Sequence, residues 1–185
     1  MIVLKKAIIV ILSLIAQQQA EMKNFKPLDE LTGTDTGIDR QMSLMITDQR
    51  QFLEMWQAHK QLLGDTQNTG NITIAEAQVP KVDFKKNVVF VFFAGQNQGI
   101  NGWDISNVDT KGKAAIISIA PQRFADALIS NSFGMWVFPR PTKAVDLEVV
   151  IGMNNGKPVT KKVAHFEAPK VQKDSKTSGG ASTGS

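Results

Sequence analysis

Residues 87–94 read Asn-Val-Val-Phe-Val-Phe-Phe-Ala, and this run decides the class of fold. Its members are β-branched or aromatic almost throughout, which is typical of a strand that is buried on both faces. From Val88 to Phe93 no polar residue interrupts it, so it lacks the alternation of a strand with one face in water. We therefore expect a fully buried strand at the centre of a β-rich domain.

The chain that follows this run also has the pattern of β-strands. Further strands are predicted at residues 103–108, 114–120, 135–140, 145–151 and 159–166. Alternate residues from Val145 to Ile151 are aliphatic, which puts them on one face of their strand. Turn-forming residues lie between several strands: Asn101-Gly102, residues 109–112, and Asn154-Asn155-Gly156. Because the turns are short and no crossover helix is visible, we expect antiparallel pairing.

One amphipathic helix is predicted before these strands. Thr47 or Asp48 can cap its first turn by accepting hydrogen bonds from free backbone N–H groups. An apolar stripe then recurs at helical spacing, formed by Phe52, Met55, Trp56, His59 and Leu63. We expect the helix to end at Gly64 and its stripe to pack on the sheet that contains residues 88–93.

The expected fold class is therefore α+β and mainly β: an antiparallel sheet or small sandwich with one packed amphipathic helix. Residues 21–40 form an irregular lead-in, followed by a short strand near 38–46. Residues 167–185 are small and polar with no hydrophobic periodicity, which predicts a disordered tail. A single domain over residues 21–166 is left, a common size for one domain.

The N-terminal segment, residues 1–20, has the pattern of an export signal. Two lysines precede an apolar stretch at 7–16, about the length of a signal-peptide core and shorter than the ~20 residues of a membrane span. Cleavage is expected after Ala16 or Ala20, which would leave a soluble periplasmic or extracellular protein. The alternative is an uncleaved membrane anchor.

Composition narrows the chemistry that the chain can carry. The 185 residues have a net charge of +4 and contain no cysteine, which excludes disulfides, thiol nucleophiles and cysteine-ligated metals. Removal of residues 1–20 takes away two lysines and no acid, so the mature charge of +2 gives little support to nucleic-acid binding. We expect no cofactor and no bound metal.

The titratable residues give no recognisable catalytic motif. The two histidines, His59 and His165, are far apart in sequence and form no metal-binding pair. We expect His59 to be structural or at the surface, and His165 to be solvated. The acids are scattered, and nothing selects a pair such as a glycosidase requires, although such pairs meet only in the fold. We therefore expect a protein that is not an enzyme.

Aromatic and polar residues near two predicted strand ends are the candidates for partner binding. A polar loop is expected at the end of the buried strand, and binding residues are often found on loops held by rigid strands. Tryptophan and arginine are enriched among interface hot spots. The predicted contact residues are Gln96, Asn97, Gln98, Trp103, Trp136 and Arg140. The alternative for both tryptophans is ordinary packing in the core.

Several short motifs together resemble a known family. In chain order they are Gly33, Thr36-Gly37-Ile38, Phe52 and Trp56 on the helix, Pro80, Asp83-Phe84, Asn87-Val88-Val89, Ala94-Gly95, Gly102-Trp103, Ile105 and Val108. In this order they resemble the PrcB C-terminal-like family, named after an accessory subunit of a secreted protease complex. The resemblance covers roughly residues 32–150. The chain departs from the pattern at Asn101-Gly102, where a double glycine is expected, and at residues 133–137, where a Pro-Tyr-type segment is expected.

The resemblance implies an exported, non-catalytic protein that binds or stabilises a protease. We therefore expect an accessory or modulating partner of an extracytoplasmic protease, with its effect on that protease left open. One alternative is a cell-envelope glycan-binding module in which Trp103 and Trp136 stack on sugars. A less favoured alternative is a small hydrolase that uses an acid pair.

Overall fold

The computed structural model describes residues 22, 24–34, 36–61, 79–123 and 129–169. The export signal predicted at 1–20, the expected helix end at Gly64 and most of the tail predicted at 167–185 lie outside the described residues.

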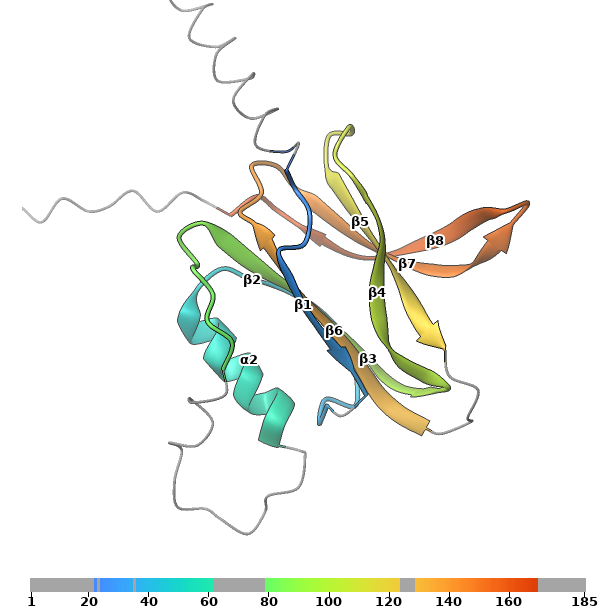
Figure 1. The fold of residues 1–185 in the computed structure, drawn as a ribbon, viewed down its shortest axis with the longest axis horizontal. Coiled ribbons are helices and arrows are strands. Elements are labelled where there is room, and N and C mark those ends of the chain that lie inside the picture. The colour runs from blue at the N-terminus through green and yellow to red at the C-terminus, as the bar shows by residue number, and fades with distance from the viewer. Residues whose placement is uncertain (1–21, 23, 35, 62–78, 124–128, 170–185) are drawn as a thin grey trace, which may run out of the picture.

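The described residues form two four-stranded sheets and a helix, which confirms the predicted class of a mainly β fold with one packed helix (Figure 1). The first sheet, sheet A, has the strand order β1-β6-β3-β2 and is antiparallel throughout. The second sheet, sheet B, has the order β4-β5-β7-β8. In chain order the elements are β1 (Asp29–Gly33), β2 (Gln41–Ile46), α2 (Gln49–Gln61), β3 (Asn87–Gln98), β4 (Ile100–Asp109), β5 (Ala115–Arg123), β6 (Ile129–Pro139), β7 (Val145–Asn154) and β8 (Lys157–Phe166).

Strand β3 lies in the middle layer of three, with α2 on one side of sheet A and sheet B on the other (Figure 1). Its side chains alternate between two cores. Val88, Phe90 and Phe92 pack toward sheet B, while Val89, Val91 and Phe93 pack in a second cluster with Phe52, Met55 and Trp56 of α2. The prediction of a strand buried on both faces, with the helix stripe packed against it, is therefore confirmed.

The N-terminus of α2 is capped as the sequence predicts. Asp48 accepts a hydrogen bond from the backbone N–H of Gln51 over 2.9 Å, and the side chain of Gln51 accepts one from the N–H of Thr47 over 3.4 Å. These two bonds satisfy N–H groups that have no partner within the helix. They fix where the helix begins, and so which residues form the stripe facing β3.

The connections between strands differ from the prediction. Asn101-Gly102 is not a turn: both residues lie inside β4, where the register with β5 shifts between Ile100 and Gly102. The chain instead bends at Gly99, whose φ of 67° favours glycine, and β4 leaves sheet A for sheet B. Strands β5 and β7 pair in parallel, because β6 between them belongs to the other sheet. The expectation of antiparallel pairing alone was wrong for this pair.

Candidate partner-binding surface

The predicted contact residues do not form one surface. Gln98 at the end of β3 pairs with Ile129, whereas Asn87 at its beginning pairs with Pro139, the residue before Arg140. At about 3.4 Å per residue, the length of β3 separates these two ends by roughly 35 Å. The Gln96–Gln98 segment and Arg140 therefore lie at opposite ends of sheet A, which corrects the expectation that they border the same site.

The two tryptophans proposed as exposed anchors are core residues. Trp136 is 0% exposed and Trp103 is 5% exposed, and both pack in the cluster between the sheets. The ring of Trp103 meets Phe92 edge-on, with centroids 4.8 Å apart. Neither ring can contact a partner in this state, so the packing alternative is the correct one. The sequence showed that both lie near strand ends, but not which face of the strand each occupies.

The segment expected to be a polar loop is part of β3, and one of its residues has a structural role. Asn97 is half-buried, and its amide nitrogen donates to the carbonyl of Gly95 over 2.8 Å and to the hydroxyl of Ser132 over 2.7 Å. Trp103 donates to the same hydroxyl. Asn97 therefore helps to hold β3 and β6 together, whereas Gln96 and Gln98 are exposed.

Arg140 is held by the chain segment that precedes β3. Its guanidinium donates to the carbonyl of Phe84 over 2.7 Å, and its backbone N–H donates to the carbonyl of Lys86 over 2.7 Å. The side chain is half-buried, so part of its donor capacity already serves the fold. The remaining part is accessible at this end of sheet A.

His59 is buried, as a structural residue is. It is 1% exposed, packs edge-on against Phe133 with ring centroids 4.5 Å apart, and its Nδ1 atom has no hydrogen-bond partner. Burial, together with the nearby charge of Lys60, lowers the pKa of His59 to about 4. The neutral ring is therefore the form present near pH 7, and it lies within an aromatic cluster away from any open site.

His165 belongs to a group of charges on β7 and β8. Its Nδ1 lies 2.5 Å from Asp146 Oδ1, and Lys162 Nζ lies 2.6 Å from Asp146 Oδ2. Burial alone would raise the pKa of Asp146, but the hydrogen bonds from Lys162 and His165 outweigh it and lower the pKa. The hydrogen bond to Asp146, and a weaker one to Glu167, raise the pKa of His165. In the described residues no group of three or more His, Asp or Glu side chains could hold a metal ion.

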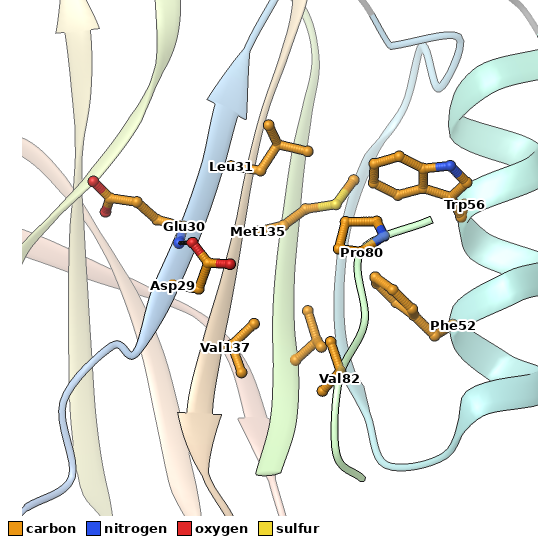
Figure 2. Close-up of a pocket in the computed structure, with 10 residues that line it drawn as sticks. Asp29, Glu30, Leu31, Phe52, Trp56, Pro80, Val82, Met135 and Val137 are labelled. Atoms are coloured by element: carbon orange, nitrogen blue, oxygen red, sulfur yellow. Dashed lines mark hydrogen bonds between the residues drawn. The ribbon is translucent and has the colours of Figure 1, made fainter. Parts of the chain in front are cut away.

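Among the hollows in the described part of the chain, one is small, and in another the acidic side chains accept hydrogen bonds from within the chain. The first encloses about 40 Å³ between α2, β1 and β6, where Phe52 and Trp56 face Leu31 and Met135 across an apolar gap (Figure 2). The second contains Asp109 and Glu148 on sheet B. Glu148 accepts a hydrogen bond from Thr160 over 2.6 Å, and Asp109 accepts one from the N–H of Lys111 over 2.9 Å. Each of these two carboxylates therefore already accepts a hydrogen bond from within the chain.

A group of exposed apolar side chains lies at the far end of the β7–β8 hairpin, where the sequence analysis predicted no binding site. We call residues 151–161, the far end of the β7–β8 hairpin, the hairpin arm. Ile151 is 59% exposed, Met153 67% and Val159 39%. The period-two pattern puts Ile151 on the same face as Val145 and Leu147, but Ile151 is exposed whereas those two residues are buried. A register shift between Val150 and Gly152 breaks the alternation, and β5 pairs with β7 only as far as Val149.

No helix in the described residues is long and apolar enough to cross a membrane. Comparison with known proteins finds no matching family model, no matching curated protein and no matching solved structure.

Proposed function

We propose that this chain is an exported, non-catalytic protein-binding domain that serves as an accessory or modulating partner of an extracytoplasmic protease. The observation that carries the binding role is the hairpin arm, which extends beyond the rest of sheet B with its apolar side chains in water (Figure 1). The export signal and the PrcB-like motifs of the sequence support the exported location and the protease as partner.

The hairpin arm is unusual because it exposes several large apolar side chains to water. All nine residues from Ile151 to Val159 are exposed, so no other described element covers either face of this part of the ribbon. A two-stranded ribbon alone in water is only marginally stable, and exposing large apolar side chains on it adds no stability. Apolar groups grouped on a protruding element are typical of interaction sites. Binding a partner would bury them.

The glycan-binding alternative depended on two exposed indole rings. Both Trp103 and Trp136 are buried, so that alternative loses the observation that favoured it. The hydrolase alternative depended on a carboxylate pair in a pocket. Asp109 and Glu148 share a hollow in which each accepts one hydrogen bond from within the chain, and the hydrolase alternative stays an untested prediction.

Capture from the exported protein fraction of the source cells tests the proposed function. The full chain, purified after natural processing, is immobilised and its bound proteins are identified by mass spectrometry and by an active-site label for proteases. We expect one protease to be enriched over beads without protein, and its activity or thermal stability to change when the soluble chain is added. Lys111→Ala, in an exposed turn, is the control variant and should capture equally. Retention of no protease, or proteolysis by the purified chain itself, would contradict the proposal.

A further inference from the structure

We propose that the hairpin arm docks on a protein surface that is apolar at its centre and bordered by Asp and Glu side chains. This inference rests on the proposed function and deepens it, because it names the surface that binds and the chemistry of its partner. Four observations carry it: the free ribbon, its charge, the position of its polar turn and the residues of its outer edge.

The first observation is the extent of the free ribbon. Strand β5 pairs with β7 from Ala115 to Ile119, and the last pair is Ile119 with Val149. Beyond Val149, β7 is bonded only to β8, through pairs that end with Asn154 and Lys157. Within the part of the chain that the structure describes, no layer covers Ile151, Met153 and Val159, whereas Pro158 and Thr160 line a hollow with residues of β4 and β5. They are presented on the end of a ribbon whose base is anchored in sheet B.

The second observation is the charge of the arm. Residues 151–161 contain Lys157 and Lys161, both exposed, and no acid. The nearest carboxylate along β7, Glu148, accepts a hydrogen bond from Thr160, and Asp146 beyond it is paired with Lys162. The arm therefore carries two lysines and no acid, and the carboxylates of Asp109 and Glu148 lie at its base, in a hollow that Pro158 and Thr160 also line. Complementary charge on the partner speeds encounter and selects against basic surfaces.

The third observation is the position of the polar turn, which favours a protein over a lipid surface. Asn155 and Gly156 have φ values of 49° and 75°, as a type I′ turn requires, and they form the outermost point of the arm. If the arm inserted into a lipid bilayer by its tip, this polar backbone would enter first, and unpaired N–H and C=O groups are costly in the bilayer interior. The apolar residues lie behind the turn, on the strands. Such an arm is suited to lie along a surface rather than to insert by its tip.

The fourth observation concerns the outer edge of β8, which disfavours a second copy of this chain. Pro158 lacks an N–H group, so an added strand could not form a full hydrogen-bond ladder there. Lys157 and Lys161 are exposed along the same strand, and Lys162 next to them is paired with Asp146. Two antiparallel copies of β8 would bring these like charges close together, which is destabilising. A partner with carboxylates would instead meet the lysines favourably.

The turn and the register of the arm favour one shape of the ribbon, whose base is anchored in sheet B. The tight turn sets the pairing of Asn154 with Lys157, and the register shift after Val150 places the residues that follow it. A ribbon that already has its bound shape loses little conformational entropy when it docks.

A displayed library of random peptides provides a defined probe for the arm. Selection on the full chain should enrich peptides that combine Leu, Ile or Phe with Asp or Glu. Affinity of a selected peptide should fall at least about tenfold in a variant with Ile151→Ser and Met153→Ser, as expected for loss of interface anchors. It should fall similarly in Lys157→Glu with Lys161→Glu, and also as salt is raised. The matched control, Lys111→Glu with Lys113→Glu, makes the same change in net charge on an exposed turn and should retain binding.

Circular dichroism and the melting temperature serve as the folding check for every variant. We expect all of them to be folded, because all the altered residues are exposed. The inference would be overturned by no enrichment of acidic-apolar peptides, by equal binding of the arm variants, or by arm-dependent binding to phosphatidylglycerol vesicles in place of peptides. Arm-dependent self-association in sedimentation would do so as well.

The same variants separate this inference from the proposed function. If the unaltered chain captures a protease and the arm variants capture it equally, the protease-binding role stands and the arm is not its surface. If the arm selects acidic-apolar peptides while no chain captures a protease, the docking chemistry stands and the protease proposal fails.

Discussion

Trp103 donates its indole N–H to the hydroxyl oxygen of Ser132 over 2.9 Å, and this bond links β4 of sheet B to β6 of sheet A. Ser132 is 0% exposed, and its oxygen also accepts from Asn97 over 2.7 Å. One hydroxyl therefore satisfies two donors from two strands. The backbone N–H of Trp103 is satisfied separately, by the side chain of Thr32 in β1 over 2.7 Å.

Ser132→Ala should destabilise the domain by about 2–4 kcal/mol, because it leaves two buried or half-buried donors without an acceptor. The measurement is the free energy of unfolding from urea denaturation. Asn107→Ala, an exposed position on β4, is the control and should change it by less than about 0.5 kcal/mol. If Ser132→Ala unfolds with the parent's midpoint, a water or a shifted side chain replaces the hydroxyl.

Gly134→Ala should destabilise the domain by about 1–3 kcal/mol or more, because the added methyl would overfill the core. Its carbon would lie 2.3 Å from the ring of Trp136 and 3.2 Å from Cβ of Trp103. Gly152→Ala is the matched control, since a methyl group there meets nothing within 4 Å. Thermal melting of the two variants should differ by several degrees, and equal melting temperatures would contradict this packing.

Trp56→Ala should cost about 3–5 kcal/mol, as truncation of a large core aromatic does. Trp56 is 4% exposed, in the cluster that joins α2 to β3. Arg50→Ala alters an exposed residue of the same helix, which forms a surface ion pair with Glu54 over 3.7 Å. We expect that variant to melt within a few degrees of the parent. Comparable melting of the two variants would mean that the helix stripe contributes little.

Acid should weaken the fold through His59. Its pKa is about 4 in the folded chain and near 6.5 when unfolded, so the unfolded state binds the extra proton first. This contribution to stability is fully present above pH 6.5 and is lost as the pH falls through 4, by about 3 kcal/mol in total. His59→Leu should flatten the dependence of unfolding free energy on pH between 6.5 and 4. An unchanged slope in that variant would assign the loss to other groups.

The pKa of His165 should lie above the usual histidine value, so its contribution to stability should change with pH in the opposite direction to that of His59. Its bond to Asp146 raises the pKa, so the stabilising charged pair is complete below pH 6.5 and is lost as the pH rises through the raised pKa. The ring resonances of His165 in an NMR titration measure this directly. Asp146→Asn should return the pKa toward 6.5, whereas Glu148→Gln, on the same strand, should alter it less. A parent pKa at or below 6.5 would contradict the pair.

Local signals predicted much of the fold. The run around Phe90, the stripe around Trp56 and the Asp48 cap each depend on residues that are neighbours along the chain or one helical turn apart. The Asn155-Gly156 turn was predicted for the same reason, since few dipeptides tolerate its backbone angles. Strand β1 was missed, because Asp29–Gly33 is short, half polar and paired only with distant β6.

The candidate site was harder to predict, because exposure depends on the other sheet. Trp103 and Trp136 lie near strand ends, and only the stacking of sheet B on sheet A buries them. The period-two pattern groups Ile151 with Val145 on one face of the strand, and the register shift after Val150 and the end of the β5 pairing leave Ile151 exposed. Neither fact is encoded in local periodicity. The sequence contains the apolar residues and lysines of the arm, but it does not show that the arm extends beyond the core.

The bend at Gly99 has a consequence for how the chain folds. Strand β3 lies in sheet A, β4 and β5 in sheet B, β6 in sheet A again and β7 in sheet B, so neither sheet is built from one continuous stretch of chain. Sheet A needs β6 to join β1 and β3, and sheet B needs β7 and β8, so neither sheet can be completed before most of the chain has arrived. Formation should therefore be a single cooperative and comparatively slow event, governed by contacts between distant segments. For a chain that is threaded across a membrane before it folds, such a layout would delay folding until most of the domain has emerged on the far side.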